Sequence, residues 1–171
     1  ELTYLSISLI TLPMPICKFY DTISTVSAQH RCMGLDIGKK TIGIAVGDAG
    51  HKVASPLKIL WRTKFTPDAH QLIKMIDEYA IGLLVIGWPL NMDGTQGPKC
   101  DSVRDFAHAF LALHDINICF HDERLSTAAV ERTMIDADMT RNMRSKRRDA
   151  LAAAWILQSA FDGIAAQKQG E

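Results

Sequence analysis

The sequence predicts an α/β fold built on one mixed sheet of five strands, three antiparallel strands followed by alternating helices and strands, flanked by helices. Two observations predict this class. Three short apolar runs follow one another with only turn residues between them, which indicates hairpin connections. Farther along, apolar runs of strand length alternate with segments of helical periodicity, which indicates strands joined by helices.

The three consecutive strands are expected at residues 33–37, 41–47 and 53–60. Gly38-Lys39-Lys40 separates the first two and reads as a hairpin turn. Pro56 cannot donate a hydrogen bond to a neighbouring strand, so the third run is expected at an edge of the sheet.

The remaining elements alternate in type along the chain. The run IGLLVIGW is nearly continuously apolar, which suits a strand covered on both faces. In order, the expected elements are a helix from Pro67, a strand at 81–88, a helix at 103–113, a strand at 116–120, a short helix capped by Ser126, and a last helix at 150–164.

Length and composition fit a single globular domain. The chain has 171 residues, of which 47% are hydrophobic and 22% charged. Lys plus Arg equals Asp plus Glu at 19 each, so net charge argues neither for nor against a nucleic-acid partner. The four cysteines form no CxxC pair and no Cys/His metal spacing, which favours reduced thiols over a zinc site or a disulfide framework.

Residues 1–32 are expected to be an N-terminal extension, disordered or artefactual, and the working domain is expected to occupy residues 33–171, starting at Met33. The apolar stretch at 2–16 is too short to span a membrane and is broken by Pro13 and Pro15. It also lacks the basic region of a signal peptide.

Three acidic residues stand at the ends of predicted elements, where one fold could bring them together. Asp36 ends the first strand in MGLDIGKKTIGIAVGD, Glu123 follows the strand at 116–120, and Asp149 opens the alanine-rich last helix. Carboxylate oxygens are the ligands that hard cations such as Mg²⁺ prefer. We therefore expect the three to meet at one end of the sheet, close enough to share metal ions. The structural alternatives are a turn-forming aspartate at Asp36 and a helix-dipole partner at Asp149.

The loop GWPLNMDGTQGP, residues 87–98, follows the buried strand at the sheet end where α/β proteins bind ligands. Its turn-forming residues also allow a purely structural loop. As a functional loop, it would offer the Trp88 ring for stacking on a base and the backbone amides of Gly94 and Thr95 for nucleic acid, with Asn91 as a further contact.

The segment HDERLST places a guanidinium next to a carboxylate. Arg124 directly follows Glu123, a pairing that suits a phosphodiester substrate. The alternative is an ion pair between Asp122 and Arg124 at a helix entrance. His121 is better explained as a structural histidine at a strand end than as a ligand or base.

A basic segment precedes the last acid. Five of the eight residues at 141–148 are Lys or Arg, and they lead directly into Asp149. Such a segment beside a carboxylate cluster suits a polyanion, and we expect a mobile substrate clamp here rather than a solvated loop. The candidate substrate contacts of this segment and of the first turn are Lys39, Lys40, Lys146, Arg147 and Arg148.

The four motifs DIGKKTIGIAVGD, GWPLNMDGTQGP, HDERLST and DALAAAWILQ closely resemble, in order and spacing, those of the YqgF/RuvX family. This family, of the RNase H-like superfamily, comprises Holliday-junction-resolvase-like proteins that are also called pre-16S ribosomal RNA nucleases. The resemblance covers about residues 33–164. It implies an RNase H-like fold and an Mg²⁺- or Mn²⁺-dependent endonuclease that matures the 5′ end of 16S rRNA in the bacterial cytoplasm, with Asp36, Glu123 and Asp149 as catalytic metal ligands.

Two positions depart from the family pattern. Many members carry arginine where this chain has Thr41, and leucine is usual where it has Trp88. Since neither change removes a carboxylate, we expect both to affect substrate contacts rather than metal binding. The implied partners are precursor rRNA or branched DNA and ribosomal particles, with no membrane, and the chain is a monomer or a homodimer.

The sequence is compatible with three functions. The first is a two-metal endonuclease, acting on precursor rRNA or, as a dimer, on a four-way DNA junction. The second is an ATPase of the actin and sugar-kinase type, which needs two lobes where this chain has length for one. The third is a non-catalytic nucleic-acid-binding module, which the presence of all three acids argues against.

Overall fold

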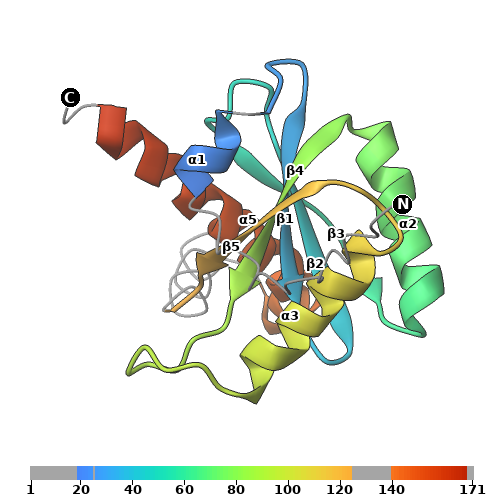
Figure 1. The fold of residues 1–171 in the computed structure, drawn as a ribbon. Helices are drawn as coiled ribbons and strands as arrows, with labels where there is room; N and C mark the ends of the chain where they lie inside the picture. Colours follow the sequence, from blue (N-terminus) through green and yellow to red (C-terminus); the bar gives the residue numbers. More distant parts are fainter. Residues whose placement is uncertain (1–18, 25, 125–139, 169–171) are drawn as a thin grey trace, which may run out of the picture.

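The computed structural model describes residues 19–24, 26–124 and 140–168. Figure 1 shows a central five-stranded sheet with helices packed on it. The strands are β1 Arg31–Ile37, β2 Thr41–Gly47, β3 Ala54–Trp61, β4 Ile81–Trp88 and β5 Asn117–Asp122. The helices are α1 Phe19–Ile23, α2 Phe65–Glu78, α3 Pro98–Leu111 and α5 Arg141–Lys168.

The strand order across the sheet is β3-β2-β1-β4-β5. β1, β2 and β3 are joined as antiparallel neighbours, whereas β4 runs parallel to β1 and β5 parallel to β4. β3 is an edge strand, as Pro56 predicts, and the apolar run of β4 is an interior strand. The expected RNase H-like fold is confirmed. Because β1, β4 and β5 are parallel, their carboxyl ends lie at one edge of the sheet.

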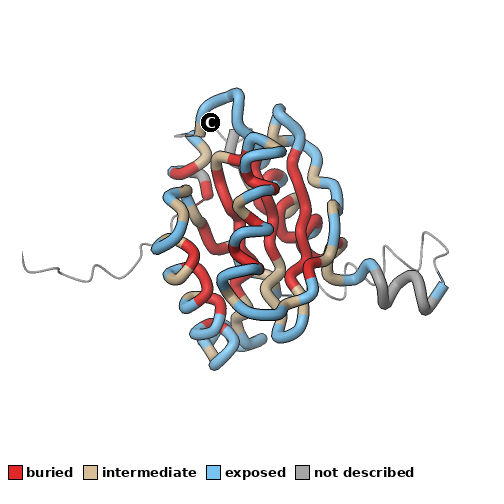
Figure 2. The backbone as a smooth tube through the Cα atoms, turned by 90° about the vertical axis from the view of Figure 1, so that its right-hand side faces the viewer, coloured by how far each residue is buried: buried red, intermediate tan, exposed pale blue. Residues whose placement is uncertain are grey.

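Helices cover both faces of the sheet, and the strands between them form the core (Figure 2). Apolar side chains of α2 and α3 pack with one set of strand residues, whose members include Leu35, Ile42 and Ile86. α5 packs on the other face, where Ala153 and Ala154 lie against Ala45. Small side chains at these positions let the α5 backbone approach the sheet closely, so that polar residues of α5 can contact residues of the strands.

The fold begins earlier than the expected Met33. β1 starts at Arg31, and Cys32 is fully buried. Within the segment expected to be an extension, Phe19 of α1 is buried against Phe161 of α5, with ring centroids 6.1 Å apart. Residues of this segment therefore contribute to the core.

Helix α5 also begins earlier than expected, at Arg141 rather than Ala150. No Gly or Pro occurs between Arg141 and Asp162, and Arg, Lys, Met and Ala all have good helix propensity, so the charge run continues the helix instead of interrupting it. Asp149 consequently lies about two turns inside the helix and is not a first-turn partner of the helix dipole. The short helix expected after Ser126 falls outside the described residues.

None of the helices that the structure describes is long and apolar enough to cross a lipid bilayer.

Candidate active site

The site is built on one row of residues that crosses three strands. Asp36 of β1 pairs with Gly43 of β2. On the other side of β1, Leu35 pairs with Ile86 of β4, so the residues that follow them, Asp36 and Gly87, also lie side by side. Residues in one row of a sheet point to the same face. This is the face that α5 covers, because a Cβ at Gly43 would collide with the backbone carbonyl of Asp149.

Each glycine makes room for one of the other two acids. Gly43 lies directly under the backbone of Asp149, and a Cβ at Gly87 would collide with the carboxylate of Glu123. A larger residue at Gly43 would push the α5 backbone at Asp149 away from the sheet, and one at Gly87 would displace the carboxylate of Glu123. The structure thus brings Asp36, Glu123 and Asp149 together at the carboxyl edge of β1, β4 and β5.

Separate contacts hold the second and third acids. Glu123 directly follows β5, and its backbone N–H donates a hydrogen bond of 3.3 Å to the carbonyl of Trp88 at the end of β4. The Thr41 hydroxyl donates a hydrogen bond of 2.5 Å to Oδ2 of Asp149. Thr41 therefore contacts one of the three acids directly, and the expectation that this position affects substrate contacts stays a prediction.

The three carboxyl groups lie close enough to affect one another's ionisation. Burial raises the pKa of Asp36 to about 6, and the neighbouring charge of Asp149 adds to the rise. Burial raises the pKa of Glu123 to about 7, with a further contribution from Asp36. Carboxyls that are partly removed from water and face one another are costly to ionise, and a bound cation relieves that cost.

The donor set fits a hard divalent cation, since it consists of three carboxylates at one edge of the sheet. Within the described ranges, however, no group of three or more His, Cys, Asp or Glu side chains is placed so that it could hold a metal ion. Like charges repel, and a cation at this site would need the acid side chains to turn toward one another.

Lys99 is a charged neighbour of the site that sequence reasoning missed. It lies in the first turn of α3, and its positive charge lowers the pKa of both Asp36 and Glu123. Lys99 and Glu123 also line the same pocket, of about 410 Å³, together with Arg124 and Asn91. The available signal was its position at the start of a helix directly after the loop at 87–98.

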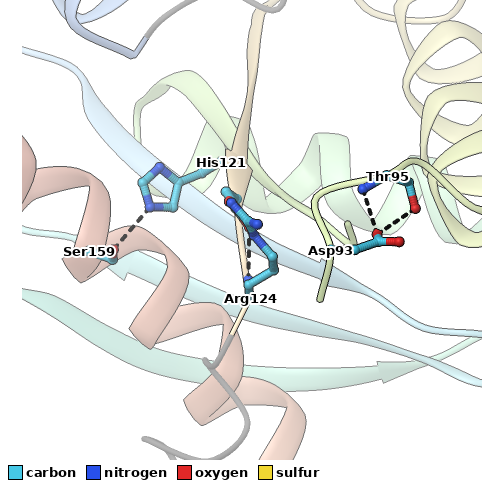
Figure 3. A network of polar contacts seen from close by, with 6 residues as sticks. Asp93, Thr95, His121, Arg124 and Ser159 are labelled. Carbon is cyan, nitrogen blue, oxygen red and sulfur yellow. Dashed lines mark hydrogen bonds and ion pairs between the residues drawn. The ribbon is translucent and has the colours of Figure 1, made fainter. Parts of the chain in front are cut away.

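Polar groups of the loop between β4 and α3 form hydrogen bonds with one another. The amide of Gly94 donates to the Asn91 carbonyl, and the amide of Thr95 donates to the Asp93 carboxylate, at 2.8 and 2.9 Å. Figure 3 shows Asp93 and Thr95 joined in this way. The expectation that the Gly94 and Thr95 amides are available to nucleic acid is therefore wrong, although Asn91 is exposed at the rim of the Lys99 pocket.

Trp88 was expected to stack on a base, and this is wrong as well. Its side chain is only 5% exposed. The ring packs on Phe120, with centroids 4.6 Å apart, and the Arg104 guanidinium lies 5.3 Å from its centroid. Trp88 therefore belongs to the core between β4 and α3, and it has no ring face left for a ligand.

Arg124 and His121 both have partners within the chain. Arg124 forms an ion pair of 2.6 Å with Asp122, as the structural alternative predicts, and its guanidinium stays exposed beside the loop at Gly94. His121 makes a 3.0 Å hydrogen bond with Ser159 of α5 (Figure 3), and burial lowers its pKa. These contacts favour a structural histidine.

Exposed cations lie close to the acids in the sequence. Lys39 and Lys40 lie in the turn between β1 and β2, three and four residues after Asp36, and Arg147 and Arg148 precede Asp149 on α5. The side chain of Lys146 lies outside the described part of the chain. The described cations therefore lie within a few residues of an acid in the sequence, two in the turn after β1 and two on α5.

Comparison with known proteins places these features in context. The family model described as "RuvX: Holliday junction resolvase" matches residues 30–163. A Paramagnetospirillum magneticum protein named "Putative pre-16S rRNA nuclease" is 45% identical over 149 residues, which cover 87% of this chain and 96% of that protein. A Phenylobacterium zucineum protein of the same name is 52% identical over 153 residues, 88% and 98% of the two chains. Among solved structures, T. thermophilus RuvC in complex with Holliday junction substrate is 14% identical, covers 80% of this chain and 96% of that one, and has a TM-score of 0.49.

Proposed function

Because the chain belongs to the RuvX family, we propose that it is a divalent-metal-dependent endonuclease that cleaves phosphodiester bonds in the precursor of 16S rRNA. The observation that carries this proposal is the row of Gly43, Asp36 and Gly87, in which the two glycines leave space for the backbone of Asp149 and the carboxylate of Glu123 at one edge of the sheet. The relatives named for a pre-16S rRNA nuclease match along most of the chain and support rRNA as the substrate.

Asp36, Glu123 and Asp149 would hold the metal through their carboxylate oxygens. Mg²⁺ or Mn²⁺, as a pair of ions, would supply an activated water and stabilise the charge on the leaving 3′ oxygen. The chain's own contribution is placement. Thr41 fixes one oxygen of Asp149, and the two glycines keep the row open.

The cations near the acids would bind the negatively charged phosphates of the substrate. Lys99 favours the ionised form of two of the acids, which is the form a metal requires. Arg147 and Arg148 are exposed on α5 just before Asp149, and Lys39 and Lys40 are exposed in the turn that follows β1. Phosphates bound by these residues would bring the scissile bond over the acids.

The test is cleavage of two labelled substrates side by side, a precursor 16S rRNA fragment and a synthetic four-way DNA junction, each with Mg²⁺, with Mn²⁺ and with a chelator. We expect metal-dependent cleavage of the rRNA fragment, abolished by Asp36→Asn. Preferential, symmetric cleavage of the junction would instead identify the Holliday junction activity that the family description names, and that activity requires a dimer.

Two other results would contradict the proposal. Binding of both substrates without cleavage under any metal condition would leave a non-catalytic nucleic-acid-binding module. ATP turnover without nuclease activity would favour the ATPase alternative, which the match to the RuvX family disfavours. A nuclease acting on ribosomal precursors would work in the cytoplasm, on free RNA or on ribosomal particles, as a monomer or a homodimer.

A further inference from the structure

Trp61 is the last residue of β3, at the end of the edge strand nearest the acids. It pairs directly with Thr41 of β2, whose hydroxyl is bound to Asp149. Residues opposite each other in an antiparallel pair lie on the same face of the sheet, with Cβ atoms roughly 5 Å apart. Trp61 therefore stands on the α5 face, one strand away from the residue that holds the third acid.

The Trp61 side chain is 72% exposed, more than any other large hydrophobic residue that the structure describes. A single exposed apolar residue needs no special explanation on its own. At this position, however, an indole offers a large flat π-face beside a site for a polyanion. Nucleobases stack on such faces whatever their sequence.

The backbone under Trp61 is held in place. The amide of Arg62 donates to the Lys40 carbonyl at 2.9 Å, and Nη1 of Arg62 donates to the Gly38 carbonyl at 2.7 Å. The Arg62 guanidinium also lies 5.8 Å from the ring centroid of Phe106 on α3. These contacts tie the end of β3 to the β1–β2 turn, so a base that stacks on Trp61 would be fixed relative to Asp36.

We propose that Trp61 is a stacking platform for an unpaired base next to the scissile phosphate, and that the protein therefore cleaves RNA where the strand is single. This inference rests on the proposed nuclease function and deepens it. Bases in a duplex are already stacked on their neighbours, so only an unpaired nucleotide can place its face on an indole beside the cleavage site.

The test measures binding of a short single-stranded RNA and of the same sequence in a duplex, in the Asp36→Asn background to prevent cleavage. Trp61→Ala should weaken single-strand binding by roughly tenfold, the loss expected for one stacked base. Trp61→Phe should recover much of that loss. Duplex affinity and the salt dependence of binding should stay unchanged, because stacking releases no counterions.

Trp155 provides the matched control. It is 41% exposed on α5, between the buried Ala154 and Ile156, so Trp155→Ala removes a second exposed indole from the same molecule. RNA should quench the tryptophan fluorescence of the Trp155→Ala protein as it does that of the parent, whereas Trp61→Ala should remove most of the quenching.

Equal single-strand affinity in the Trp61→Ala and parent proteins would overturn the stacking role, as would an equal loss of affinity for single strand and duplex. A change of oligomeric state in Trp61→Ala, with RNA affinity unchanged, would show instead that the indole is a protein contact. If the wild-type protein neither binds nor cleaves RNA, the proposed function itself fails. If it cleaves RNA but Trp61 makes no difference, only the stacking inference fails.

Discussion

The Thr41 hydroxyl joins the sheet to the helix that carries the third acid. Its hydrogen bond occupies Oδ2 of Asp149 and so orients the carboxylate. Hydrogen bonds to charged groups contribute about 1.5–3 kcal/mol when buried and well aligned. Thr41 would therefore act as a positioning residue through Asp149.

Thr41→Val removes this hydrogen bond at nearly constant volume. We expect the cleavage rate at limiting Mg²⁺ to fall by roughly tenfold or more, while the affinity for RNA stays the same. Thr41→Ser, which keeps the hydroxyl, should retain most of the activity. The comparison of the metal dependence of cleavage in the three proteins checks this, and equal curves for wild type and Thr41→Val would exclude the role.

Lys99 tunes the acids from the start of α3. Since its charge lowers the pKa of Asp36 and Glu123, Lys99→Gln should raise both values and move the acidic limb of the cleavage–pH profile to higher pH. Lys74→Gln removes an exposed charge from α2 and is the control. A profile that stays in place, with only the affinity for RNA reduced, would show that Lys99 contacts phosphate but does not tune the acids.

Single residues were also where prediction from sequence failed. Sequence reasoning selected Trp88 as the base-stacking tryptophan, because it opens a loop at a ligand-binding edge. The structure buries Trp88 and exposes Trp61. Burial at the end of a strand depends on which neighbouring elements pack over it, and here Phe120 of β5 and Arg104 of α3 cover Trp88. Neither contact leaves a local signal in the sequence.

At the scale of elements, α5 connects binding and chemistry. Its buried small residues lie on β2, while the turns that precede Asp149 carry the exposed Arg147 and Arg148. The sequence pattern identifies the basic run and the acid, but it predicts a mobile clamp outside the helix. Strong helix formers on both sides of Asp149 instead make one continuous element, so the cations and the acid keep a fixed spacing along the helix.

The double variant Arg147→Ala, Arg148→Ala tests this arrangement. RNA affinity should fall and the salt dependence of binding should flatten by about one to two units of slope, because one or two fewer counterions are released. The free energy of unfolding should hardly change, since exposed charges contribute little. Lys58→Ala with Lys74→Ala removes the same charge from β3 and α2, and should leave the slope unchanged if the α5 cations are specific.

At the scale of the molecule, topology explains why the site could be anticipated. Three hairpin strands followed by alternating helices and strands force β1, β4 and β5 to be parallel, so residues after these strands meet at one edge. That argument placed Asp36 and Glu123. The contacts of Asp149 with Thr41 and Gly43 depend on how closely α5 approaches the sheet, which the strand pattern does not determine.

The crowding of acids predicts a particular pH dependence of stability. In the unfolded chain Asp36 and Glu123 titrate near 4, whereas in the fold the pKa of Asp36 is about 6 and that of Glu123 about 7. Between these limits the folded protein binds more protons than the unfolded chain. Without metal, the two acids therefore make the free energy of unfolding decrease as pH rises from about 4 to about 7, and level off above that.

Asp36→Asn removes one of these acids and the repulsion it exerts on its neighbours. At pH 8 in a chelator the variant should be more stable than wild type by about 1 kcal/mol, a value reduced from the full pKa shift because the group is only half-buried. The advantage should disappear near pH 4, where the wild-type carboxyl is protonated in the fold as well. Denaturant unfolding across this range, with the exposed α3 variant Asp105→Asn as the control, measures the difference. A stability difference between Asp36→Asn and wild type that does not change with pH would contradict the raised pKa of this carboxyl in the fold. Mg²⁺ should reverse the order at pH 8, because only the wild-type carboxylate retains the charge that binds the cation.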